Sequence, residues 1–106
     1  MKKITDEAQK AFHAGYYFKK GNTEVIIDND KGERRFYLHG HCIAKKVLGN
    51  GLYLSHCGWK TNTTKERLNG ILDAYRSAWI HQKDFTWYLV KNEKETLFLD
   101  GWNKIE

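Results

Sequence analysis

The chain has 106 residues, of which 41% are hydrophobic and 14% aromatic, and its formal net charge is +5. This length allows one domain, and the aromatic content argues against disorder. No apolar run approaches the roughly 20 residues that a membrane-spanning helix needs, and acidic residues follow the N-terminal lysines where a secretory signal would be apolar. We therefore expect a single domain over residues 1–106, located in the cytosol and not in a membrane.

The first predicted element is a short helix near the N-terminus. Thr5 is its expected N-cap, because a hydroxyl can accept a hydrogen bond from a free backbone N–H of the first turn. Gly15 is expected to end it, since glycine readily adopts the left-handed conformation that follows many helices. One face of this helix carries its apolar residues, Ile4, Ala8, Ala11 and Phe12.

A series of strands is expected next. Runs of β-branched and aromatic residues predict strands over residues 16–19, 23–28, 34–39, 41–48 and 51–57. The turn signals Gly21-Asn22 and Asn50-Gly51 separate neighbouring runs. Strands joined by such short turns are antiparallel, because a parallel crossover needs a much longer connection.

The second helix has the clearest local signal. Thr63 and Glu66 fit a capping box, in which the threonine caps the helix and the glutamate reaches back to the cap. The apolar residues that follow at helical spacing are Leu68, Ile71, Leu72 and Tyr75. Three more strands are expected over residues 78–82, 86–91 and 96–100. The predicted fold class is α+β, a mainly antiparallel β-sheet with two helices packed on it.

Histidine and cysteine gather in one predicted hairpin. If its loop is Gly49-Asn50, position 42 lies opposite position 57, so both cysteines share one face and the histidines share the other. A Cys2His2 zinc site would need both faces, which argues against it. The weak metal candidate is therefore a three-histidine set, and no carboxylate is placed to orient its rings. Its members are His39, His41 and His56. We expect no cofactor.

Catalytic signatures are absent from the sequence. It contains no Gly-rich dinucleotide loop, phosphate-binding P-loop, zinc-protease helix motif or nucleophile elbow. We therefore expect that the protein is not an enzyme.

Basic and aromatic residues on the predicted sheet suggest a nucleic-acid surface. Unpaired bases stack on exposed aromatic rings while basic neighbours hold the phosphates. Tyr37 alternates with Phe36 and Leu38, so it is expected to face away from the core. The basic candidates beside it are Arg34, Arg35, Lys45 and Lys46. The competing interpretation is a solvated surface without a ligand.

Two segments resemble a pattern found in small uncharacterised proteins of tailed bacteriophages. The first contains Leu38-His39-Gly40 and Ile43-Ala44, and the second runs from Gly58-Trp59 to Leu68-Asn69. The resemblance implies a phage origin and carries no assigned function. Four polar residues of the second segment have no structural role evident from the sequence, and we predict that they form a binding surface. They are Thr61, Asn62, Arg67 and Asn69.

The leading hypothesis is therefore a phage-encoded accessory protein. It would bind a host macromolecule, a protein complex or a nucleic acid, and modify or inhibit it, with an anti-CRISPR-like anti-defence role as one version. The first alternative is a nucleic-acid-binding module that uses the basic and aromatic residues of the sheet. The second alternative is a small nucleotide-binding or metal-dependent protein.

Overall fold

The computed structural model describes residues 2–75 and 78–106. Its elements in chain order are α1 (Lys3–Ala14), β1 (Phe18–Lys20), β2 (Thr23–Asp28), β3 (Glu33–Leu38), β4 (His41–Val47), β5 (Gly51–Leu54), α2 (Asn62–Leu72), β6 (Ala78–Lys83), β7 (Thr86–Lys91), β8 (Lys94–Leu97) and β9 (Asn103–Lys104). All described strand pairs are antiparallel. The predicted α+β class, mainly antiparallel sheet with two helices, is confirmed.

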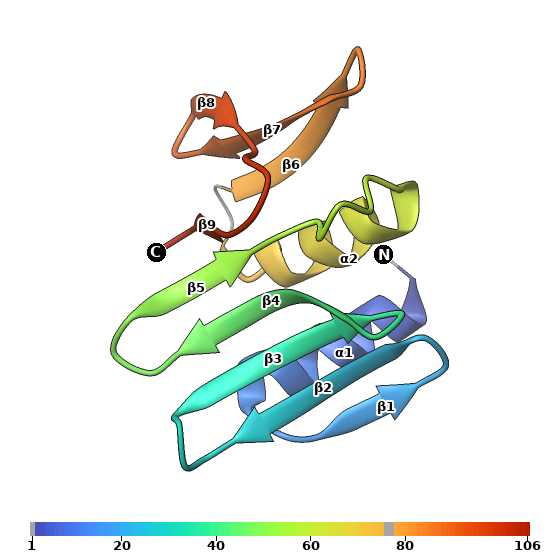
Figure 1. Cartoon of the computed structure of the whole chain (residues 1–106), viewed down its shortest axis with the longest axis vertical. Helices are drawn as coiled ribbons and strands as arrows, with labels where there is room; N and C mark the ends of the chain where they lie inside the picture. The colour runs from blue at the N-terminus through green and yellow to red at the C-terminus, as the bar shows by residue number, and fades with distance from the viewer. Residues whose placement is uncertain (1, 76–77) are drawn as a thin grey trace.

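The strands form two sheets. The larger has the order β1-β2-β3-β4-β5-β9, and the smaller has the order β6-β7-β8 (Figure 1). The C-terminal strand β9 returns from the small sheet to pair with β5, so the chain's last segment belongs to the large sheet. This two-residue strand was not predicted, because it is too short to show a periodic pattern.

Both helices lie on the same side of the large sheet (Figure 1). Strand residues therefore alternate between a buried face toward the helices and a face open to solvent. In β3, Phe36 and Leu38 are buried whereas Arg35 and Tyr37 are only partly covered. We call the side away from the helices the open face.

One hydrophobic core joins the two sheets and the two helices. It includes Phe12 of α1, Phe36 of the large sheet, Leu68 of α2 and Trp87 of the small sheet, each no more than 1% exposed. Ile105 from the C-terminal segment belongs to the same cluster. Burial of these side chains is the main force that holds the layers together.

The start of α1 differs from the prediction. The helix begins at Lys3, so Thr5 lies within its first turns and is fully buried instead of capping it. The predicted end is confirmed, because Gly15 has φ of 86° and its N–H donates to the carbonyl of Ala11. Tyr16 N–H donates to the same carbonyl, which delays the first strand to Phe18.

The cap of α2 also differs from the prediction. The N-cap is Thr61, whose hydroxyl accepts from the backbone N–H of Thr64 at 3.1 Å. The threonine-rich run offers several residues of capping type, and sequence spacing alone favoured Thr63. Glu66 does not reach back to a cap, because its carboxylate accepts hydrogen bonds from α1 and from Arg67.

The β4–β5 hairpin has a three-residue loop, so the predicted register is wrong. Val47 pairs with Gly51, and Asn50 N–H donates to the Val47 carbonyl across the loop. A change of one residue in a loop exchanges the faces of a strand, so the predicted sharing of faces by cysteines and histidines fails. Gly51 has φ of 123°, and a Cβ there would overlap the backbone carbonyl of Glu106. Only glycine fits this position.

Arg67 links three elements from inside the core. The residue is 3% exposed, and its guanidinium donates to the hydroxyl of Thr5 in α1 at 2.8 Å and to that of Thr23 in β2 at 3.2 Å. It also forms an ion pair with Glu66. Burial opposes ionisation of Glu66, but the hydrogen bonds from Thr5 and Arg67 prevail and lower the pKa of that carboxyl.

We predict that Arg67→Met strongly destabilises the protein. The substitution removes the positive charge beside the Glu66 carboxylate and the hydrogen bonds that Arg67 donates to it and to two buried hydroxyls, which should cost about 3–5 kcal/mol in the free energy of unfolding. Urea denaturation followed by circular dichroism measures this cost. Adding Glu66→Gln should restore part of it, because the uncompensated charge is then gone.

The matched control is Lys10→Ala. Lys10 is exposed on α1 and pairs with Asp6 at 3.0 Å, so its loss should cost less than about 0.5 kcal/mol. An Arg67→Met protein as stable as the control would show that the buried network does not hold the helices together.

Candidate functional site

A row of basic side chains with one tyrosine among them crosses the open face of the large sheet. Arg35 of β3 pairs with Lys45 of β4, Lys45 pairs with Tyr53 of β5, and Tyr53 pairs with Lys104 of β9. Directly paired residues of neighbouring strands share a face, and strands lie about 4.8 Å apart, so these four side chains span about 14 Å. We call Arg35, Lys45, Tyr53 and Lys104 the cationic row.

Aromatic rings accompany the cationic row. The Lys45 ammonium lies 4.5 Å from the ring centroid of Trp102 and 5.4 Å from that of Tyr53. The Lys104 ammonium lies 6.0 Å from the Tyr53 centroid. These cation–π contacts hold the two lysines over the sheet instead of letting them extend into solvent.

The charge of the row is only partly balanced. Arg35 pairs with Glu33 at 2.9 Å, and the hydrogen bond from Arg35 lowers the pKa of the Glu33 carboxyl. Among residues 2–75 and 78–106, neither Lys45 nor Lys104 has a carboxylate within 4.0 Å. Like charges that face each other across strands repel, as Arg35 and Lys45 do. An anion on the open face would relieve this repulsion.

The predicted nucleic-acid residues divide between the two faces. Tyr37, Arg35 and Lys45 lie on the open face, whereas Arg34 and Lys46 lie beneath the sheet on the helix side. Successive side chains of a strand point to opposite faces, so the two members of Arg34-Arg35 and of Lys45-Lys46 lie on different sides of the sheet.

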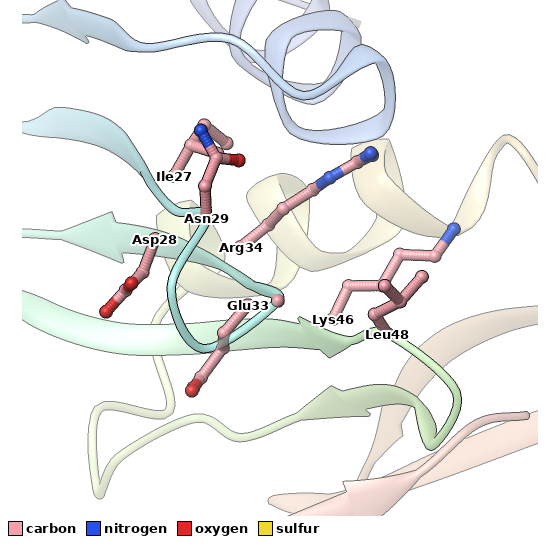
Figure 2. Close-up of a pocket in the computed structure, with 8 residues that line it drawn as sticks. Ile27, Asp28, Asn29, Glu33, Arg34, Lys46 and Leu48 are labelled. Atoms are coloured by element: carbon pink, nitrogen blue, oxygen red, sulfur yellow. The ribbon is translucent and has the colours of Figure 1, made fainter.

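Arg34 and Lys46 line a cavity of about 200 Å³ at the end of the sheet. Figure 2 shows both side chains extending toward the helices, while the carboxylates of Asp28 and Glu33 point away from them. Arg34 donates to the carbonyl of His13 at 2.7 Å and also to that of Phe12, so it occupies free carbonyls at the end of α1. Arg34 therefore has a structural role.

A second cavity, of about 550 Å³, brings the two phage-like segments together. Residues of the first segment and its β3–β4 turn form one wall, and residues that lead into α2 form the other. We call this cavity the motif pocket; its lining residues are Leu38, His39, His41, Ile43, Trp59, Thr61, Thr63 and Thr64.

The motif pocket is mainly apolar and has an aromatic mouth. Trp59 is 54% exposed, which is high for so large an apolar side chain. The His41 ring lies beside it, with centroids 5.4 Å apart. No Asp, Glu, Lys or Arg side chain lines the cavity in the described part of the chain. This combination suits an uncharged planar group.

The four polar residues predicted as a binding surface also divide. Thr61 and Asn62 are exposed at the start of α2, and Thr61 lines the motif pocket. Arg67 is buried in the network that joins the helices. Asn69 bonds both the N–H and the carbonyl of Ile80, at 2.7 and 2.9 Å, and so fixes β6 to α2. Arg67 and Asn69 therefore have structural roles that the sequence analysis did not identify, because partners far along the chain occupy their polar atoms.

The three histidines of the weak metal candidate are held in different ways. His39 lies in the β3–β4 turn with φ of 51° and contacts the Asn22 amide, whereas His41 stands beside Trp59. His56 is buried and bonds Asp100 at 3.0 Å. No group of three or more His, Cys, Asp or Glu residues in 2–75 and 78–106 could hold a metal ion. The three-histidine arrangement does not form, because the predicted register was wrong.

Both cysteines are free thiols with local partners. Cys57 Sγ donates to the carbonyl of Cys42 at 2.8 Å, and Cys42 Sγ donates to that of Ala44 at 3.3 Å. Burial raises the pKa of the Cys42 thiol to about 11. A thiol that stays protonated is a poor nucleophile, so Cys42 is suited to packing.

The C-terminal segment adds site residues that the sequence analysis missed. Trp102 and Lys104 join the open face because β9 pairs with β5. They lie about 50 residues from their neighbours in the row, and no local pattern marks their segment as a strand. Trp59 was not among the predicted site residues, and the one signal for it was its place in the second phage-like segment.

The fold and its surfaces define an α+β protein with an open, cationic sheet face and a separate apolar pocket. The chain belongs to the Kyanoviridae Gp96 protein family, a phage family whose model matches residues 1–104. The phage origin implied by the sequence resemblance is thereby confirmed. No curated protein and no solved structure matches this chain. None of the described helices is both long and apolar enough to cross a membrane.

We predict that Cys42 reacts slowly with iodoacetamide at pH 8. With a pKa of about 11, about one Cys42 thiol in a thousand is ionised there, and the rate should rise about tenfold per pH unit up to pH 10. The Cys57→Ser variant leaves Cys42 as the only thiol. The serine hydroxyl can still donate to the backbone carbonyl of Cys42, as the Cys57 thiol does. Mass spectrometry measures the rate.

The same variant unfolded in urea is the control. Its rate should level off near the ordinary thiol pKa of about 8.5. A folded protein whose rate levels off at the same pH would show that burial does not control the thiol.

Proposed function

We propose that this phage protein acts by binding and not by catalysis, and that its open face binds single-stranded nucleic acid. The observation that carries the proposal is the cationic row, in which Lys45 and Lys104 lack carboxylate partners among the described residues. Backbone phosphates would supply the missing negative charge.

Aromatic rings beside the row favour a single strand over a duplex. Tyr37 and Tyr53 are partly exposed on the open face, and Trp102 is 41% exposed beside Lys45. Such rings stack on unpaired bases, which a duplex does not offer. Both helices lie on the other side of the large sheet, so the open face presents no helix to a major groove (Figure 1).

Binding of this kind fits an accessory role in an infected cell. The family places the protein in phages, and the host cytosol is where its nucleic-acid targets would be met. By covering a single strand that a host complex must reach, the protein would inhibit that complex. An anti-defence role is the version in which the complex is an immune effector.

We predict that the protein binds a fluorescent 12-nucleotide single strand with steep salt dependence. Each phosphate contact should contribute about 0.7 to the slope of log affinity against log salt. Lys45→Gln and Lys104→Gln should each lower affinity and reduce the slope by about that amount. Fluorescence anisotropy between 50 and 300 mM salt provides the measurement.

Lys83→Gln is the matched control, because Lys83 is exposed at the end of β6 in the other sheet. It should leave both affinity and slope unchanged. Affinity that is insensitive to salt, or equal effects of all three substitutions, would contradict the assignment of the open face.

Direct inhibition of a host protein is the second candidate function. The outer side of the small sheet carries Trp79, 48% exposed, and Leu97, 57% exposed. The His81 and Tyr88 rings stack between these positions, with centroids 5.3 Å apart. Exposed aromatic and aliphatic side chains of this kind are typical of protein interfaces.

A pull-down from host lysate with and without nuclease separates the two candidates. For the leading proposal, captured host proteins should disappear after nuclease treatment, and Lys45→Gln should reduce their capture. For the second candidate, one host protein should survive nuclease and be lost with Trp79→Ser. A nuclease-resistant partner retained by Trp79→Ser would argue against the small sheet as its docking surface.

A further inference from the structure

We propose that the motif pocket holds one unpaired nucleobase of the strand whose phosphates lie on the cationic row. The inference rests on the proposed function and adds a base-binding site to it. Its centre is the indole ring of Trp59, which stands half exposed at the mouth of a cavity of about 550 Å³.

The size and lining of the cavity suit a base. Its volume falls within the range of about 300–1,000 Å³ typical of small-ligand sites. The Trp59 indole presents a flat apolar surface, and stacking on such a surface stabilises a bound base whatever its identity. Leu38 and Ile43 line the cavity beneath and are nearly fully buried.

Two polar groups are available to the edge of a base. Within the described part of the chain, the Thr63 hydroxyl and the ring nitrogens of His41 make no hydrogen bond, although both residues line the pocket. The other polar atoms are engaged: the Thr61 and Thr64 hydroxyls bond each other at 3.0 Å, and His39 contacts Asn22. A base carries both donors and acceptors on its edge.

The absence of charge from the lining favours a base within a polymer over a free nucleotide. A free nucleotide brings its phosphates with it, and the described lining includes no Lys or Arg to receive them. In a longer strand, the cationic row would receive the phosphates while the pocket takes only the uncharged base.

The pocket and the row are close enough for one strand. His41 and Lys45 are four residues apart on β4, which corresponds to about 13 Å along the strand. The pocket lies on the helix side of the sheet, so the bound strand would pass around the β3–β4 turn. Gly40 is exposed there, and no atom lies within 4 Å of where its Cβ would be.

The test compares a 12-nucleotide thymidine strand with a strand of the same length that lacks its bases. Wild-type protein should bind the thymidine strand about tenfold more tightly, and Trp59→Ala should remove most of that difference. The Trp59→Ala variant should keep the wild-type affinity for the baseless strand and the wild-type slope of log affinity against log salt, because the phosphate contacts remain. Trp59→Phe should retain most of the preference, since a ring is still present.

Phe85→Ala is the matched control, because it removes an exposed aromatic ring from the β6–β7 turn of the other sheet, a residue outside both proposed binding surfaces. It should leave both affinities unchanged, and thermal denaturation should show that both alanine variants remain folded. Equal affinity of Trp59→Ala and wild type for the thymidine strand would overturn the base pocket while leaving strand binding on the open face intact. Failure of wild type to bind either strand would overturn both proposals.

Two further results would reassign the pocket. Thymidine monophosphate that binds wild type as tightly as the 12-nucleotide strand would show a site for free nucleotides. Loss of a nuclease-resistant protein partner on Trp59→Ala would show a site for a protein side chain. Either result would overturn the proposal.

Discussion

The buried guanidinium of Arg67 is the constraint on which the arrangement of the protein depends. A charge inside a core is stable only when its donors and counter-charge are matched, and here the matching groups come from α1, α2 and β2. The helices can therefore take few positions relative to the sheet. Because the network fixes α2, it also fixes Thr61 at the helix start and the wall of the motif pocket that leads into it.

Packing both helices on one side of the large sheet gives its two faces different roles. The covered face contributes Phe36 and Leu54 to the core, whereas the other face presents Arg35 and Lys45 to solvent. Successive side chains of a strand point to opposite faces, and this alone separates the apolar residues from the basic ones. The motif pocket lies where the sheet ends and the covering helix begins, so its floor is apolar while its mouth is open.

Local patterns in the sequence predict most of the fold, and distant contacts account for the failures. Periodicity correctly indicated both helices and most strands, because it reflects which side chains face a core. The roles of Arg67 and Asn69 could not be inferred, since Thr5 and Ile80 lie 62 and 11 residues away and nothing local marks them as partners. The three-residue loop before Gly51 changed the register by one residue, which was enough to disperse the predicted histidine set. For the candidate site, the sequence identified the basic and aromatic residue types and the outward face of Tyr37, but it did not divide the basic pairs between the two faces or include Lys104.

The two-residue strand β9 would couple docking of the C-terminal segment to the ligand binding that we propose for the open face. Lys104 lies in the cationic row because β9 pairs with Tyr53 and Leu54 of β5, and the Ile105 N–H also donates to the carbonyl of Leu52. A ligand that contacts Lys45 and Lys104 together therefore stabilises the docked segment, and by reciprocity a more firmly docked segment binds the ligand more tightly. Under that proposal, pairing of β9 with β5 and occupancy of the open face would each favour the other.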